Sequence, residues 1–363
     1  MKKIIIFFLM IFNLIYAEEN KNYRSYLLGD QLGEIYIKEN ERKLYPLASV
    51  TKIMTLLVTY DAIENNEITP KDKVVIDKEI LKINGSKIWM YEGQRITVED
   101  LIKATAIHSA NNAAYALAKY IGKGNVDIFI KRMKNKSIEL GIEEEVEFFT
   151  PTGLPTSMTG KPMDKGSALG IYKLSLEALK YDSLIKLASQ KEVSIYNGKQ
   201  NLKNRNKIIG KEGVYGLKTG HHSKAGYNMS VLSENSGMDI VYVILGGKNE
   251  EERDYKILKD IRKFYNEYKK EIFLNENIVL DNLKIENGNK NNIDVYPEKS
   301  FSKIVKNGSQ IKILLKYYPI SFPIYKNSEV GHYKILLNNS IIDEGELLIK
   351  EKVIENKGKF KKM

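Results

Sequence analysis

The sequence predicts an α+β protein: an antiparallel sheet covered by helices, with a helical subdomain inserted into it, and then a small all-β domain. Strand-like runs lie near both ends of the first 270 residues, and helical patterns fill the region between them. After about residue 272 the chain changes to short β-branched and aromatic runs separated by Asn, Gly and Pro. We therefore expect one domain over residues 18–270, a β-rich domain over 271–350 and a basic tail over 351–363.

The N-terminus has the pattern of a secretory signal peptide. Lys2 and Lys3 precede an apolar run over residues 4–15, and Ala17 ends the segment. The run is too short to span a bilayer comfortably, which makes an uncleaved anchor the weaker interpretation. Residues 1–17 are therefore predicted to be removed and the protein exported, and the absence of cysteine fits an exported protein.

The first domain begins with a predicted hairpin and a buried helix. Two strand-like runs, 25–28 and 34–38, flank a glycine-containing turn. The following helix, from Ser49 to Ile63, is apolar on nearly all sides, which is typical of a helix buried in a core.

The rest of the first domain is predicted from periodicity and capping signals. Thr97 and Asp100 resemble a capping box at the start of a helix. The expected helices are 98–107, 112–121, 126–140, 165–180 and 250–268. The expected strands are 214–219, 227–232 and 238–245, the last two joined by a turn over 233–237. In the second domain the expected strands are 278–285, 293–296, 310–317 and 332–337, and the basic tail is expected to be disordered.

Composition excludes several kinds of site. The chain has no cysteine, four histidines and no His-Glu-x-x-His, so we expect neither a metal nor a cofactor. The formal net charge of +11 suits an anionic envelope surface, and it equally suits a lysine-rich bias spread along the chain. Basic residues do not form a stripe interleaved with aromatics, so nucleic acid is not an expected partner.

Three short motifs occur in the order that an acyl-serine enzyme needs. They are Ser-x-x-Lys at Ser49, Ser-x-Asn at Ser109 and Lys-Thr-Gly at Lys218. The first two also occur elsewhere in the chain, whereas Lys-Thr-Gly occurs once. Local context therefore has to separate functional copies from accidental ones.

Serine needs an adjacent base to act as a nucleophile at neutral pH. Lys52 lies one helical turn after Ser49, so both side chains face the same way. A lysine buried near a second cation, here Lys218, is pushed toward the neutral form that can accept the serine proton. The alternative, a helix cap with a surface lysine, is disfavoured by the apolar helix that follows.

The other two motifs offer groups for proton relay and substrate binding. Ser109 supplies a hydroxyl and Asn111 a carboxamide on a helix-to-helix connection, where a simple polar cap is the alternative. Lys218 and Thr219 end a predicted strand and could grip a carboxylate. Gly220 could let a substrate lie close to that strand, although an ordinary hairpin start is the alternative.

Together the motifs resemble the signatures of penicillin-binding proteins and serine β-lactamases. Further segments narrow the resemblance to the low-molecular-mass D-alanyl-D-alanine carboxypeptidases, serine peptidase family S11. These segments are 46–49, 204–206, 216–221, 224–228, 246–247, 322–326 and 329–331. The resemblance covers nearly the whole mature chain and implies a penicillin-binding-protein/β-lactamase-like transpeptidase fold with a β-rich C-terminal domain.

The resemblance implies a role for each site residue. Ser49 is the nucleophile, Lys52 the general base and Ser109 the proton relay. Asn111 positions the substrate, while Lys218 and Thr219 bind its terminal carboxylate beside Gly220. The backbone N–H groups of Ser49 and His221 form the oxyanion hole, and Arg205 supports carboxylate recognition.

The implied substrates are peptidoglycan stem peptides ending in D-Ala-D-Ala, and β-lactams are implied as covalent inhibitors. The resemblance also implies peripheral contact with the outer face of the cytoplasmic membrane, although residues 346–363 contain few apolar positions. Three alternatives stay open at this point: a D,D-endopeptidase, a serine β-lactamase and a non-catalytic penicillin sensor. We find no convincing Glu-x-x-x-Asn loop among residues 143–147, which disfavours a class A β-lactamase.

Overall fold

The computed structural model describes residues 22–356, so the predicted signal peptide and residues 357–363 of the predicted tail lie outside the described residues. The chain divides into two compact units. The first comprises residues up to 235 together with 239–262, and the second comprises 236–238 together with the residues from 263 onward. The predicted domain boundary, after residue 270, falls within the first long strand of the second unit.

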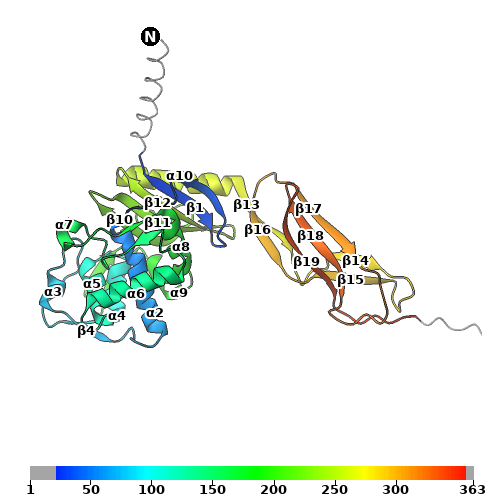
Figure 1. The fold of residues 1–363 in the computed structure, drawn as a ribbon, viewed down its shortest axis with the longest axis horizontal. Helices are drawn as coiled ribbons and strands as arrows, with labels where there is room; N and C mark the ends of the chain where they lie inside the picture. The colour runs from blue at the N-terminus through cyan, green and yellow to red at the C-terminus, as the bar shows by residue number, and fades with distance from the viewer. Residues whose placement is uncertain (1–21, 357–363) are drawn as a thin grey trace, which may run out of the picture. The chain divides into compact units, whose positions relative to one another are not determined.

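The first unit is built on a five-stranded sheet in the order β10-β11-β12-β1-β2 (Figure 1). Its strands are β1 Ser25–Asp30, β2 Ile35–Glu39, β10 Val214–His222, β11 Gly226–Asn235 and β12 Met238–Gly247. β1 pairs antiparallel with both β2 and β12, which brings the start of the chain beside residues more than 200 positions later. The predicted hairpin and the three predicted late strands are confirmed, and β10 lies at one edge of the sheet.

The strand pair β11–β12 turns more tightly than the sequence predicts. β11 continues to Asn235, so that only Ser236 and Gly237 connect it to β12. Both residues have a positive φ, 53° and 74°, as a two-residue type I′ turn requires.

Helices fill the region between the early and late strands. They are the 3-10 helix η1 Ala48–Thr51, then α2 Lys52–Glu64, α3 Lys78–Leu81, α4 Val98–Ala106, α5 Asn111–Ile121, α6 Val126–Glu139, α7 Thr156–Thr159, α8 Ala168–Ala178, α9 Asp182–Ala188 and α10 Glu250–Glu267. α2 is buried along nearly its whole length and contacts α4, α5, α6 and α8, while α8 also contacts β1 and β11. The predicted buried helix is therefore the centre of the first unit's core.

Two caps show where sequence signals succeed and fail. The Thr97 hydroxyl accepts a hydrogen bond from the Asp100 N–H at 3.1 Å, which confirms the predicted start of α4. The helix predicted from Lys165 instead begins at Ala168, because the Ser167 hydroxyl accepts a hydrogen bond from the Gly170 N–H at 2.9 Å. Lys165 and Gly166 form a strand, β7, so the predicted helix start is wrong by three residues.

Several short strands are visible only in the structure. They are β3 Tyr45–Pro46, β4 Lys73–Val75, β5 Arg95–Thr97, β6 Val146–Glu147, β7 Lys165–Gly166, β8 Glu192–Ile195 and β9 Gln200–Lys203. They pair as β3-β7-β6, β4-β5 and β8-β9. Segments of two to four residues are too short for an alternating pattern to be recognised in the sequence.

The second unit is all β, as predicted. Its strands are β13 Tyr268–Leu274, β14 Asp281–Lys284, β15 Asn292–Pro297, β16 Phe301–Lys306, β17 Ile311–Tyr317, β18 Glu329–Leu337 and β19 Ser340–Ile349. β14-β15-β19-β18-β17 form one sheet and β13-β16 another, around a core that includes Val295, Tyr333 and Leu347. β13, β16 and β19 are not among the predicted strands.

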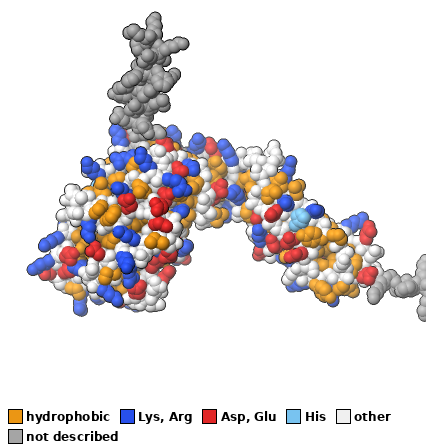
Figure 2. Space-filling model, viewed as in Figure 1, with side chains coloured by type: hydrophobic (Ala, Val, Ile, Leu, Met, Phe, Trp, Pro, Cys, Tyr) orange, Lys and Arg blue, Asp and Glu red, His pale blue; other side chains and the backbone are white. Residues whose placement is uncertain are grey.

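Charge is mixed over the molecular surface. On the face shown in Figure 2, Lys and Arg side chains alternate with Asp and Glu side chains instead of gathering into one basic stripe. None of the helices in residues 22–356 is both long enough and apolar enough to cross a membrane.

Candidate active site

Ser49 lies on a constrained turn at the start of α2. The turn is η1, and Ala48, directly before the serine, has a φ of +48°, in the left-handed region that non-glycine residues rarely adopt. The turn packs against Gly153, where a Cβ atom would lie 1.8 Å from the Ala48 carbonyl oxygen. Strain of this kind costs roughly 1–3 kcal/mol and persists only where surrounding structure enforces it.

Lys52 is the first residue of α2 and is completely buried. Its Nζ donates hydrogen bonds to Ser49 Oγ at 2.8 Å, to Asn111 Oδ1 at 2.6 Å and to the Thr152 carbonyl oxygen at 2.7 Å. Burial lowers the pKa of the Lys52 amine well below its usual value, and the charge of Lys218 lowers it further. The amine is thus in contact with the serine hydroxyl and disposed to lose its proton.

Ser109 lies in the connection between α4 and α5, and Asn111 is the first residue of α5. Ser109 has a φ of +61°, and the Asn111 N–H donates to the Ser86 carbonyl oxygen at 2.7 Å. The Asn111 Nδ2 donates to the Asn84 carbonyl oxygen at 2.7 Å, which fixes the amide so that Oδ1 faces Lys52. Gly85 makes this possible, since a Cβ there would lie 2.5 Å from Asn111 Nδ2.

Lys218 projects from the edge strand β10 and is 3% exposed. Its Nζ donates to Ser109 Oγ at 2.9 Å and to the Thr219 carbonyl oxygen at 2.9 Å. Burial, together with the charge of Arg205, lowers the pKa of Lys218 to about 7. Two buried lysines therefore flank the site, one on each serine hydroxyl.

Gly220 lies where β10 comes close to the turn that carries Ser49. A Cβ at this position would lie 2.8 Å from the Leu47 carbonyl oxygen and 2.9 Å from the Ser49 amide nitrogen. The glycine thus lets β10 lie directly against the turn that carries Ser49. The predicted role, room for a substrate along the strand, stays a prediction.

Thr219 and His221 flank that glycine on β10. Thr219 is half-buried and His221 is exposed. The His221 ring stacks on Tyr227, with ring centroids 3.9 Å apart. His221 follows Gly220 directly on β10, so its backbone extends the edge strand one residue beyond the contact with the Ser49 turn.

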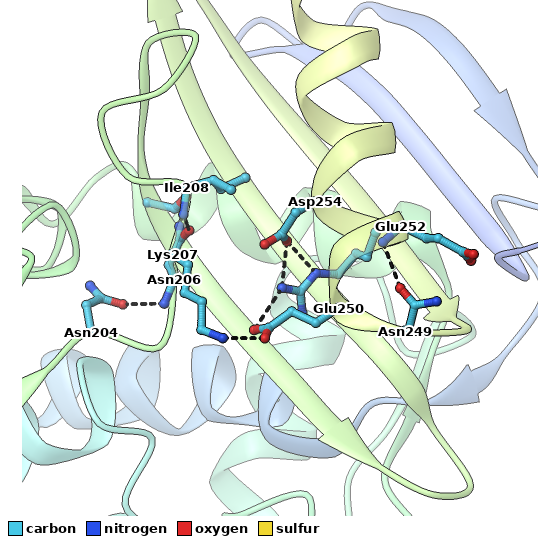
Figure 3. A network of polar contacts seen from close by, with 10 residues as sticks. Asn204, Asn206, Lys207, Ile208, Asn249, Glu250, Glu252 and Asp254 are labelled. Atoms are coloured by element: carbon cyan, nitrogen blue, oxygen red, sulfur yellow. Dashed lines mark hydrogen bonds and ion pairs between the residues drawn. The ribbon is translucent and has the colours of Figure 1, made fainter.

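Arg205 lies in a segment held by its neighbours' side chains (Figure 3). Asn204 Oδ1 accepts from the Asn206 N–H at 2.8 Å, and Lys207 forms an ion pair with Glu250 at 2.5 Å. The Arg205 guanidinium lies 3.3 Å from His108 Nε2, and its charge lowers the pKa of both His108 and Lys218. Arg205 thus stands beside the Ser109 loop, close to the Lys218 amine.

A polar loop supports the site and is absent from the sequence prediction. The carboxylate of Asp164, which is 2% exposed, accepts hydrogen bonds from the N–H groups of Phe149 and Thr150 at 2.6 and 2.9 Å, and from the Thr150 hydroxyl at 2.6 Å. Burial raises the pKa of Asp164 to about 6. The loop so fixed presents the Thr152 carbonyl oxygen to Lys52. Its sequence signal is the turn-forming run 150–153, Thr-Pro-Thr-Gly.

The site brings together all the residues that the motifs predict. Within residues 22–356, His, Asp and Glu side chains form no group of three that could hold a metal ion. The groups that the site brings into contact are the hydroxyl, amine and amide groups of Ser49, Lys52, Ser109, Asn111 and Lys218.

Comparison with known proteins agrees with this geometry. Residues 17–249 match the family D-alanyl-D-alanine carboxypeptidase, Peptidase_S11, and residues 268–355 match the C-terminal domain of penicillin-binding protein 5. The chain is 28% identical over 346 residues to D-alanyl-D-alanine carboxypeptidase DacF of Bacillus subtilis, covering 92% of this chain and 86% of the relative.

Solved structures share the fold. Penicillin-binding protein 5 of Haemophilus influenzae matches with a TM-score of 0.71 and 24% identity, over 92% of this chain and 98% of that one. Penicillin-binding protein D2 of Listeria monocytogenes, solved in an ampicillin-bound form, matches with a TM-score of 0.59 and 23% identity, over 67% and 98%. The chain belongs to the Peptidase_S11 family of D-alanyl-D-alanine carboxypeptidases, and is by that membership a serine-type carboxypeptidase and a low-molecular-mass penicillin-binding protein.

Proposed function

We propose that the chain removes the terminal D-alanine from peptidoglycan stem peptides through an acyl-serine intermediate formed on Ser49. The contact that carries the proposal is the 2.8 Å distance between Ser49 Oγ and the buried Lys52 Nζ. A hydroxyl in direct contact with an amine of lowered pKa is the arrangement that serine nucleophiles need.

Acylation begins with the contact between Ser49 and Lys52. Lys52 takes the Ser49 proton as the Oγ–carbon bond forms at the penultimate D-alanine carbonyl. The bond from that carbon to the terminal D-alanine nitrogen then breaks, and the proton passes to this nitrogen through the Ser109 hydroxyl. Water afterwards attacks the ester and returns Ser49 to its free form, releasing the shortened stem peptide.

Substrate recognition is assigned to the groups around the two serines. Lys218 and Thr219 bind the terminal carboxylate, because an amine and a hydroxyl occupy adjacent positions on the edge strand β10. Asn111 orients the peptide, and Arg205 adds positive charge beside Lys218. The N–H groups of Ser49 and His221 are proposed to hold the oxyanion, since Gly220 lets the strand approach the turn.

The same chemistry is proposed for β-lactams, whose cyclic amide would acylate Ser49 and leave a covalent adduct. A relative with this fold has been solved with ampicillin bound. We further propose that residues 1–17 direct export, so that the enzyme acts on the wall outside the cytoplasm, with peripheral contact at the membrane surface.

The deciding experiment incubates the mature protein with diacetyl-L-lysyl-D-alanyl-D-alanine and measures D-alanine release. We expect release by the unaltered protein and a loss of at least about a thousandfold in Ser49→Ala, as removal of a nucleophile commonly produces. Release by neither protein, with a lasting penicillin adduct on the unaltered one, would indicate a sensor. Rapid clearance of penicillin without D-alanine release would indicate a β-lactamase.

A further inference from the structure

A second hollow lies on the first unit, and none of the roles above uses it. Its cavity has a volume of about 950 Å³ and is bordered by the β4–β5 hairpin, the segment before β5, the start of α4 and the turn between β8 and β9. Three aromatic residues line it: Trp89, Tyr91 and Tyr196. Trp89 and Tyr91 are 65% and 52% exposed, a high exposure for large rings that the fold could have buried.

The aromatic residues are held in place by their neighbours. The rings of Trp89 and Tyr91 lie side by side, with centroids 5.2 Å apart. The Tyr196 hydroxyl donates to the Trp89 carbonyl oxygen at 2.8 Å, and the Tyr196 N–H donates to Asp100 at 3.1 Å. The Tyr91 N–H donates to the Gln94 side chain at 3.0 Å. The hollow therefore presents fixed ring faces to solvent.

The polar lining favours a ligand that has both acetamido or hydroxyl groups and negative charge. Lys73, Arg95 and Lys199 line the hollow, and within residues 22–356 their side chains form no ion pair or hydrogen bond. Asn197 and Gln200 add carboxamides, which can donate to and accept from acetamido groups. Flat aromatic faces beside amide and cationic groups fit the apolar faces and polar edges of amino sugars.

The hollow is connected to the catalytic site through one short segment. The Ser86 carbonyl oxygen accepts from the Asn111 N–H, and Trp89 follows three residues later, within a chain reach of roughly 11 Å. Between them, the N–H and carbonyl of Ile88 are both hydrogen-bonded to the Asn112 side chain, at 3.2 and 2.9 Å. A stem peptide joins its scissile D-alanine to the sugar through about four residues, a reach of roughly 14 Å.

We propose that this hollow binds the amino-sugar backbone of peptidoglycan beside the stem peptide held at Ser49. The proposal rests on the proposed function, because it takes the polymer whose stem peptide is cleaved as the ligand. The Trp89 and Tyr91 rings stack on a sugar ring, and Lys73, Arg95 and Lys199 face the carboxylates of neighbouring stem peptides. The enzyme would accordingly prefer stem peptides attached to glycan over free peptides.

The first test uses intrinsic fluorescence, since Trp89 is the single tryptophan of the chain. Ser49→Ala protein is titrated with the β-1,4-linked tetramer of N-acetylglucosamine, with dextran as a control sugar. We expect a saturable change in tryptophan emission with the tetramer and none with dextran. Tyr91→Ala should weaken the affinity at least threefold because it removes one of the two stacking rings, whereas Tyr255→Ala, which alters an exposed aromatic on α10, should not.

The second test compares two substrates. We expect the unaltered enzyme to have at least a fivefold higher kcat/KM for a disaccharide-pentapeptide than for the free pentapeptide. Trp89→Ala should abolish that preference without changing kcat/KM for the free peptide, while Tyr255→Ala, an equally exposed aromatic on α10, should retain it.

The outcomes separate this proposal from the proposed function. An unchanged emission spectrum up to millimolar tetramer, or equal kcat/KM for the two substrates, would overturn glycan binding even in an active enzyme. A protein that releases no D-alanine but shows the saturable, Tyr91-dependent emission change would contradict the proposed function and support the sugar site.

Discussion

Ser49 owes its proposed reactivity to two lysines that the fold buries without a carboxylate bound to either amine. Among the described residues, the hydrogen-bond partners of the Lys52 and Lys218 amines are hydroxyl, amide and carbonyl oxygens. A buried ammonium without an anionic partner is costly, so burial lowers the pKa of both amines. The charge of Lys218 lowers the pKa of Lys52 further, and the charge of Arg205 does the same for Lys218.

We expect kcat/KM for D-alanine release to follow a bell-shaped pH profile. Lys52 must be neutral to take the Ser49 proton, so activity rises as pH increases through its lowered pKa. Lys218 must be charged to hold the substrate carboxylate, so activity falls as pH passes its pKa of about 7. Initial rates at low substrate concentration between pH 5 and pH 10 measure both limbs.

The matched variant is Lys218→Arg, since a guanidinium keeps its charge throughout this range. Its kcat/KM should be lower overall, and the alkaline limb should move upward by at least about one pH unit. An alkaline limb that stays in place would show that Lys218 does not control it.

The sequence predicts the residues of the site whose side chains belong to short motifs. It does not predict the loop at Thr152 that binds Lys52 through a backbone carbonyl. Ser49, Lys52, Ser109 and Asn111 follow from two short patterns. Thr152 binds Lys52 through its carbonyl oxygen, which any residue could supply. Asp164 fixes that loop from a distance of more than ten residues, so the turn-forming run 150–153 predicts a turn but neither its contact with Asp164 nor its contact with Lys52.

The contact between β10 and η1 depends on the absence of a side chain at Gly220. We expect Gly220→Ala to fold but to lose at least about a hundredfold in kcat/KM, because the new Cβ would meet backbone atoms of Leu47 and Ser49 at 2.8 to 2.9 Å. Backbone cannot yield as a flexible side chain does, so β10 and the Ser49 turn must move apart. D-alanine release measures the loss, and circular dichroism checks the fold.

A thermal unfolding curve of the same variant separates two causes of inactivity. A melting temperature within a few degrees of the unaltered protein, combined with the loss of activity, is the expected result. Nearly full activity would show that the strand and the turn need not be in close contact.

The long elements could be predicted, and the short ones could not. α2 is apolar on nearly all sides, and α6 and the strands β10 to β12 carry apolar residues over many positions. The pairs β3–β7 and β6–β7 consist of two residues each and exist because distant segments meet. The error at Lys165 has the same origin, since that residue pairs with Pro46 instead of starting α8.

All the groups that are proposed to act in catalysis belong to the first unit. We expect a chain ending at Glu267, the last residue of α10, to keep kcat/KM within about threefold of the full chain on diacetyl-L-lysyl-D-alanyl-D-alanine. The same truncation carrying Ser49→Ala gives the background rate. A folded truncated protein that loses more than about thirtyfold would show that the second unit is needed for catalysis.

The overall architecture could be predicted from the sequence, because the residue composition changes at the positions where the fold changes from helices and sheet to strands alone. The α+β class, the helical insertion and the all-β C-terminal part follow from periodicity alone. The exact pairing in the second unit does not, because charged residues in β13, β16 and β19, and a glycine in β19, hide the alternation. Their places are set by neighbouring strands.

The three oxygen atoms around Lys52 Nζ also determine where the lone pair of this nitrogen points once the amine is neutral. A neutral amine has two N–H groups and one lone pair, and it must share them among Asn111 Oδ1, the Thr152 carbonyl and Ser49 Oγ. The first two oxygens carry no hydrogen, so each must receive an N–H. The lone pair is then left facing Ser49, the one neighbour with a hydrogen to give. The amide and the loop carbonyl thus aim the base before any substrate arrives.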